Sequence, residues 1–107
     1  SEAQTAALQQ LSATLFAELQ KLDYRSVQVV GHANRTGRPD ETEEELQSLS
    51  RQRAEILTES LREAGLRIEK IRWAGGDDPL SDSATAAGRA RNRRVEMFVQ
   101  SDLEDER

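Results

Sequence analysis

Few side chains in this sequence are candidates for catalysis or ligand binding, and most of these candidates are charged. The one histidine, His32, lies two residues before Asn34, and residues 89–94 contain four arginines. Acidic residues are concentrated in residues 40–45 and 102–106. We interpret the acidic runs as solvent-exposed faces. The basic run is harder to dismiss, because it leads directly into an apolar segment.

Neither a catalytic group nor a metal site can be assembled from these residues. One histidine without any cysteine excludes thiolate sites and multi-histidine sites. The acids between Glu41 and Glu45 are not spaced around a glycine-containing loop, as a calcium site requires. No nucleophile and acid accompany His32, so we interpret it as a packed side chain bonded to backbone. We expect no enzymatic activity, no metal and no cofactor.

Composition limits the size of the core and the kinds of partner. The 107 residues suffice for one domain, and 33% of them are charged, so the core must be lean. The net charge of -5 at pH 7 argues against nucleic acid as a partner. No apolar stretch reaches membrane-spanning length, so we expect no membrane contact by this domain itself. A leader or anchor elsewhere in a larger protein is compatible with this.

The elements that must position these residues follow from the spacing of apolar residues. Leucines three and four positions apart predict an amphipathic helix over residues 1–22. A short strand is expected at residues 27–30, and a loop at residues 31–40. Thr42 and Glu45 have the spacing of a capping box, which predicts a second helix that ends near Gly65.

The second half of the chain predicts two more strands. Ile68, Ile71 and Trp73 indicate a strand that ends at Gly75 and Gly76. Residues 77–92 are expected to be a long polar loop with at most a helical turn at residues 84–87. Residues 95–99 predict the last strand.

These elements predict an α/β fold in which two main helices pack on one face of a small mixed sheet. The strand–helix–strand unit implies a right-handed crossover and a parallel pair, with the last strand antiparallel. We expect one domain over residues 1–100 and a flexible acidic tail over residues 101–107.

Four segments between residues 29 and 96 resemble the OmpA-like family, which includes peptidoglycan-associated lipoproteins and the stator protein MotB. Gly31-His32-Ala33-Asn34 is similar to the family's GHTD or GHAD loop, and Leu49-Ser50-Arg51-Gln52-Arg53-Ala54 to its LSxxRA helix. Trp73 to Pro79 lies where the family has its GxGxxxP turn, and Gly88 to Glu96 is similar to its GRxxNRRVE segment. The resemblance implies the family's βαβαβ-type fold, with the family's opening strand absent from this chain.

The resemblance also implies a periplasmic domain, part of a larger outer-membrane or envelope-anchored protein, that binds peptidoglycan noncovalently. In the family, a loop aspartate and a helix arginine hold the diaminopimelate of the stem peptide. An arginine fork suits its carboxylate, and an anion suits its ammonium. The implied ligand-binding residues of this chain surround these two positions and are Asn34, Arg53, His32, Ala33, Leu49 and Arg93.

The chain departs from the family pattern at the site itself. Asn34 replaces the aspartate and offers no charge, although it could accept a hydrogen bond from an ammonium. Leu46 replaces an asparagine, and the segment before Leu49 is longer than in the lipoprotein members. Loss of the anion is expected to cost about 2–5 kcal/mol of binding, unless Asp40 or an acid of residues 43–45 replaces it.

Two functions therefore remain open. The domain binds a diaminopimelate or variant stem peptide, weakly at the altered site, or it is a degenerate module with a structural role or other envelope proteins as partners. For Arg53, ligand binding and a structural ion pair are both open. Arg93 and Arg94 are expected to pair with acids such as Asp77 or Asp78.

Two further side chains are given structural roles. Asn92 is expected to fix the turn before the last strand. Trp73 is expected to lie in the core or to cover the strand.

Overall fold

The computed structural model describes residues 1–81 and 84–101, which form three helices and a three-stranded sheet. In chain order the elements are α1 (Glu2–Gln20), β1 (Tyr24–Gly31), α2 (Glu43–Glu63), β2 (Ile68–Trp73), α3 (Ala86–Asn92) and β3 (Val95–Ser101). The predicted α/β class is confirmed. β3 reaches Ser101, and residues 102–107 of the predicted acidic tail lie outside the described residues.

The sheet has the strand order β2-β1-β3, with β1 in the middle. β1 runs parallel to β2 and antiparallel to β3, as predicted. Val29 lies opposite Ile71 on one side and Met97 on the other. In the described part of the chain the first element is α1.

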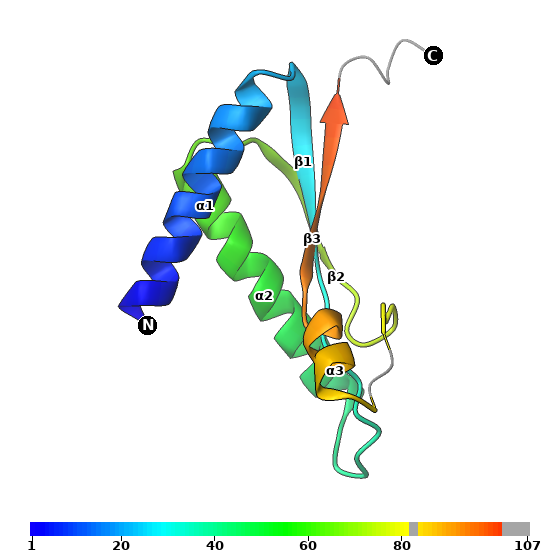
Figure 1. Cartoon of the computed structure of the whole chain (residues 1–107). Helices are drawn as coiled ribbons and strands as arrows, with labels where there is room; N and C mark the ends of the chain where they lie inside the picture. The colour runs from blue at the N-terminus through cyan, green and yellow to red at the C-terminus, as the bar shows by residue number, and fades with distance from the viewer. Residues whose placement is uncertain (82–83, 102–107) are drawn as a thin grey trace.

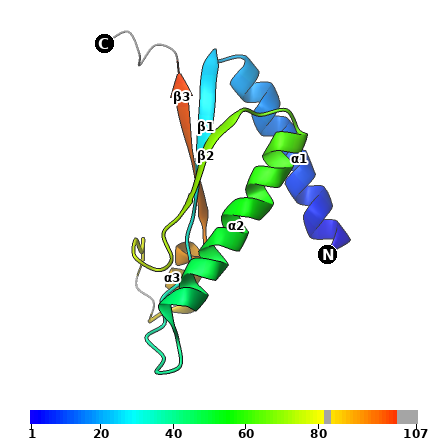
Figure 2. The ribbon, with the colours of Figure 1, turned by 180° about the vertical axis from the view of Figure 1, so that it is seen from behind.

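Both long helices lie on the same side of the sheet (Figures 1 and 2). α2 contacts all three strands, and α1 packs against α2. Val27 and Val29 of β1 are fully buried beneath the helices, together with Ala54 and Leu61 of α2. The prediction of two helices covering one face is therefore confirmed.

The contact between α1 and α2 differs from the predicted leucine stripe. Of the predicted leucines, Leu19 is buried, whereas Leu11 and Leu22 are 50% and 63% exposed. The buried centre of the contact is Ser12, whose Oγ lies 2.8 Å from Oγ of Ser60. Small serine side chains let the two helices approach closely, and their mutual hydrogen bond satisfies both hydroxyls.

β1 begins earlier than predicted because Tyr24 belongs to the core. Its side chain is 3% exposed, and its hydroxyl oxygen accepts a hydrogen bond from the backbone N–H of Arg67 at 3.2 Å. The Arg67 guanidinium also lies 4.2 Å from the centre of the Tyr24 ring. These contacts bring residues 24–26 into the sheet, although their sequence breaks the apolar pattern.

Both predicted ends of α2 are confirmed. The hydroxyl oxygen of Thr42 accepts a hydrogen bond from the backbone N–H of Glu45 at 3.1 Å and caps the helix. Gly65 adopts a φ of 106°, the left-handed conformation that glycine favours just after a helix.

The segment before β3 was predicted as a loop with a turn at residues 84–87, and this was wrong. Residues 86–92 form α3, and the Thr85 hydroxyl caps it by accepting from the N–H of Gly88 at 2.9 Å. Alanines at positions 86, 87 and 90 supply the helix propensity. α3 places Arg89 and Arg93 near the loop that follows β1.

Candidate functional site

A pocket of about 280 Å³ lies between the loop after β1, the first half of α2, and α3. These three segments lie at the same end of the molecule (Figure 1). The loop after β1 forms one wall, α2 a second and α3 a third. The lining side chains are Asn34, Thr36, Arg38, Glu41, Glu45, Leu46, Leu49, Arg53, Arg89 and Arg93. Leu46 is buried at the pocket's wall and leaves the space open.

Four of the six residues predicted for the site line this pocket. Asn34, Leu49, Arg53 and Arg93 come together there from the loop, α2 and the end of α3. The side chains of His32 and Ala33 do not line it; both are buried. The N–H of Ala33 donates to the carbonyl oxygen of Gly75 at 2.7 Å, so this part of the motif fixes the loop.

Arg53 reaches the pocket from the third turn of α2. Its Nη1 donates to the carbonyl oxygen of His32 at 3.0 Å, which orients the guanidinium. Burial, and then the positive charge of Arg93, lower the pKa of Arg53. Among the residues that the structure describes, Arg53 forms no ion pair, so the structural ion-pair alternative finds no partner.

Asn34 is held by a second asparagine from α3. Nδ2 of Asn92 donates to Oδ1 of Asn34 at 2.9 Å and to the carbonyl oxygen of Ser81 at 3.0 Å. Oδ1 of Asn92 accepts from the backbone N–H groups of Leu80 and Ser81. Asn92 is 1% exposed, and its side chain fixes residues 80–81 and Asn34 instead of the turn before β3.

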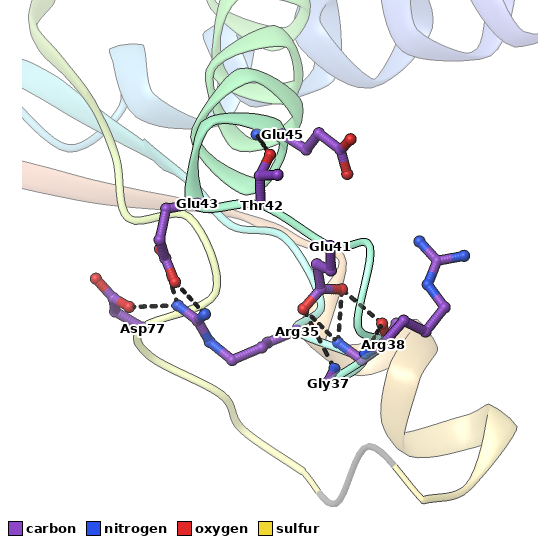
Figure 3. Close-up of polar contacts among 9 residues, drawn as sticks. Arg35, Gly37, Arg38, Glu41, Thr42, Glu43, Glu45 and Asp77 are labelled. Carbon is purple, nitrogen blue, oxygen red and sulfur yellow. Dashed lines mark hydrogen bonds and ion pairs between the residues drawn. The ribbon is translucent and has the colours of Figure 1, made fainter.

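Hydrogen bonds to the carboxylate of Glu41 hold together the loop after β1 (Figure 3). Glu41 accepts hydrogen bonds from the backbone N–H groups of Thr36 and Gly37 and from the Thr36 hydroxyl. These bonds, the hydroxyl first, hold the pKa of Glu41 below its usual range. Glu41 therefore lines the pocket with its charge already engaged by the loop.

We predict that Glu41→Gln loosens this loop. A carboxylate with a lowered pKa stabilises the folded loop above the unfolded pKa, and that contribution disappears as the pH falls through the folded pKa. The Thr36 and Gly37 amides should therefore lose protection against hydrogen exchange, relative to the intrinsic rate at each pH, in the variant at neutral pH and in the wild type at acid pH. Unchanged exchange at both amides would show that Glu41 does not hold the loop.

A second acidic residue anchors the same loop to the start of α2. Arg35 pairs with Glu43, the first residue of α2, and its Nη2 lies 2.8 Å from Oδ1 of Asp77 (Figure 3). The pairing with Glu43 raises the pKa of Arg35 and lowers that of Glu43. Asp77 was predicted to pair with Arg93 or Arg94, and it pairs with Arg35. Of the acids expected to replace the lost anion, Glu43 is thus occupied and Glu45 lines the pocket.

His32 lies outside the pocket and does not bond as predicted. Its Nε2 is 2.5 Å from Oε1 of Glu96, so its partner is a carboxylate of β3 instead of backbone. Nη2 of Arg94 lies 3.5 Å from Oε1 of Glu96 and 3.8 Å from Oδ2 of Asp78, which confirms the predicted Arg94–Asp78 pair. His32, Asp78 and Glu96 are close enough to hold a metal ion, but the guanidinium already supplies the positive charge there.

Trp73 covers the strand instead of entering the core. It is 37% exposed, and the Arg51 guanidinium of α2 lies 4.9 Å from the ring centre. This pair stands on the side of α2 that faces β2, away from the residues that line the pocket.

Several pocket residues were missed by reasoning from the sequence. Thr36, Arg38, Glu41 and Arg89 line the pocket but were not predicted. The uneven charge distribution gave a signal, because acidic residues 40–45 and basic residues 89–94 meet at this place. Their convergence depends on α3, which the sequence pattern did not reveal.

The fold agrees with comparison to known proteins. A model of the OmpA family matches residues 1–93, so the chain belongs to the OmpA family. The chain is 36% identical over 83 residues to the outer-membrane lipoprotein YfiB of Pseudomonas aeruginosa. That match covers 76% of this chain and 47% of YfiB, so the chain spans less than half the length of this relative.

Solved structures show the same fold. The C-terminal domain of Helicobacter pylori MotB matches with a TM-score of 0.72 at 19% identity, over 99% of this chain and 78% of that one. The cell wall anchor of the T6SS from Pseudomonas aeruginosa matches with a TM-score of 0.59 at 30% identity, over 87% of this chain and 66% of that one. Within the described ranges, none of the helices has the length and apolar character needed to cross a bilayer.

Proposed function

We propose that this domain is a noncatalytic binder that attaches a larger envelope protein to peptidoglycan from the periplasmic side. The observation that carries the proposal is the pocket in which Arg53, held by the His32 carbonyl, meets Asn34, Leu49 and Arg93. A relative that is an outer-membrane lipoprotein and a structural neighbour that is a cell wall anchor support this location and role.

The pocket suits a peptide carboxylate. Arg53 donates one hydrogen bond to backbone, which leaves most of its N–H groups for a ligand. An arginine fork binds a carboxylate through two parallel hydrogen bonds. We therefore propose that the stem peptide of peptidoglycan binds here through a free carboxylate, with Arg53 as the main ligand and Arg93 beside it.

Sedimentation with purified sacculi tests the proposal. We expect the domain to pellet with intact sacculi and to remain in the supernatant when the sacculi have first been digested to soluble fragments. The supernatant should contain no muropeptides released by the domain, because its role is binding. A domain that stays in solution with intact sacculi would favour the rival role, a structural or protein-interaction module.

A further inference from the structure

The orientation of the Asn34 amide decides which ligand groups the pocket can accept. Asn92 is fixed first, because its Oδ1 accepts from two backbone N–H groups, those of Leu80 and Ser81, at 2.9 and 3.0 Å. A flipped Asn92 would place its NH₂ group against these two donors. The nitrogen of Asn92 must therefore face Asn34 and the carbonyl of Ser81.

Asn34 must then turn its oxygen toward Asn92. Oδ1 of Asn34 accepts from Nδ2 of Asn92 at 2.9 Å, inside the protein. Its Nδ2 has no hydrogen-bond partner among residues 1–81 and 84–101, and Asn34 borders the pocket. Asn34 therefore presents a donor to a ligand. The Oδ1 that was expected to accept a hydrogen bond from an ammonium is turned toward Asn92.

The charges around the pocket also favour an anionic ligand. Arg38, Arg53, Arg89 and Arg93 line it, against the acids Glu41 and Glu45. Glu41 is engaged by the amides of its own loop. The partly buried Arg53 lies near the like charge of Arg93, and an anionic ligand would relieve that repulsion.

We propose that the pocket selects a third stem-peptide residue whose distal carboxylate has no free ammonium beside it. This inference rests on the proposed function and concerns the same site. Two stem-peptide chemistries share the feature: a third residue without a second amine, and a diaminopimelate whose distal amine is acylated, as in a cross-link. In both, no ammonium of the ligand lies against the N–H groups of Asn34 Nδ2. In the acylated diaminopimelate, the acyl carbonyl oxygen would also accept a hydrogen bond from Nδ2.

Three synthetic tripeptides separate these possibilities. All have the form N-acetyl-L-alanyl-γ-D-glutamyl-X, where X is meso-diaminopimelate, the same residue acetylated on its distal amine, or 2-aminopimelate, which lacks that amine. In calorimetric titrations of the wild-type domain, we expect the better of the two ammonium-free peptides to bind about tenfold more tightly than the diaminopimelate peptide. The acetylated peptide shows which of the two chemistries the pocket takes.

The Asn34→Asp variant is the matched control. Its side chain can still accept the hydrogen bond from Asn92, but it presents an anionic oxygen to the pocket. We expect the order of affinities to reverse, with the diaminopimelate peptide binding most tightly and the circular dichroism spectrum unchanged. Tightest binding of the diaminopimelate peptide to the wild type would overturn the inference and leave the proposed function standing. Failure of all three peptides to bind wild type and variant would overturn both.

Discussion

Replacing Arg53 with alanine is expected to abolish sedimentation with sacculi while the domain stays folded. Arg53 is the side chain best placed to grip a carboxylate, because its guanidinium is partly buried and oriented by the His32 carbonyl. Truncating one partner of a desolvated charge pair costs about 2–5 kcal/mol, which corresponds to a loss of affinity of about thirtyfold or more. The measurement is the bound fraction across a series of sacculus concentrations.

Arg51→Ala is the matched control for this prediction. Arg51 lies two residues earlier on α2, but it contacts Glu55 and the Trp73 ring and does not line the pocket. Its loss should leave binding unchanged. Arg53→Lys should fall between the two, because lysine keeps the charge and loses the planar fork. If Arg53→Ala pellets as well as Arg51→Ala, the pocket is not the binding site.

Replacing Gly31 with alanine is expected to destabilise the domain by about 3 kcal/mol. A Cβ at this position would lie 2.0 Å from the backbone oxygen of Ser50 and 3.0 Å from Cβ of Ala54. Both atoms belong to α2, so the helix itself must move away from the end of β1. Urea unfolding should show a lower transition midpoint.

The consequence extends to the site, because Arg53 is carried by the part of α2 that would shift. We therefore expect Gly31→Ala to weaken binding as well. Gly37→Ala is the comparison: its φ of 79° is strained for alanine, but its Cβ would meet nothing within 4 Å. It should cost about 1 kcal/mol from backbone strain alone. Equal stability losses in both variants would show that the close approach of β1 and α2 is unimportant.

The regular elements could be predicted because their sequence patterns and their packing agree. The cap at Thr42, the left-handed Gly65 and the valines of β1 all have the local structure that their residue types favour. The parallel and antiparallel pairs follow from the chain order of the elements. These features depend on neighbours near in sequence or on general rules of connection.

The features that were missed depend on particular tertiary contacts. Tyr24 joins β1 because Arg67 meets both its hydroxyl and its ring, and no local pattern contains that information. α3 is too short to show a period of apolar residues. The serine contact between α1 and α2 replaces a leucine stripe that the spacing alone indicated.

The candidate site, too, could be predicted only in part. The motif positions identified Asn34 and Arg53 as neighbours in the pocket, although they are far apart in the sequence. The amide orientation of Asn34 depends on Asn92 and, through it, on the backbone of Leu80 and Ser81. We therefore infer that asparagine at position 34 differs from the family's aspartate in more than charge, because it turns a hydrogen-bond donor toward the pocket.

The most direct test of the central claim, that this pocket binds the stem peptide, is the side-chain NMR spectrum of Arg53 and Asn34 during titration with soluble muropeptides. We expect the Arg53 Nε–H and Asn34 Nδ2 resonances to shift together and saturate, while the Arg51 Nε–H resonance stays in place. Saturable shifts elsewhere in the domain with Arg53 and Asn34 unmoved would contradict that claim.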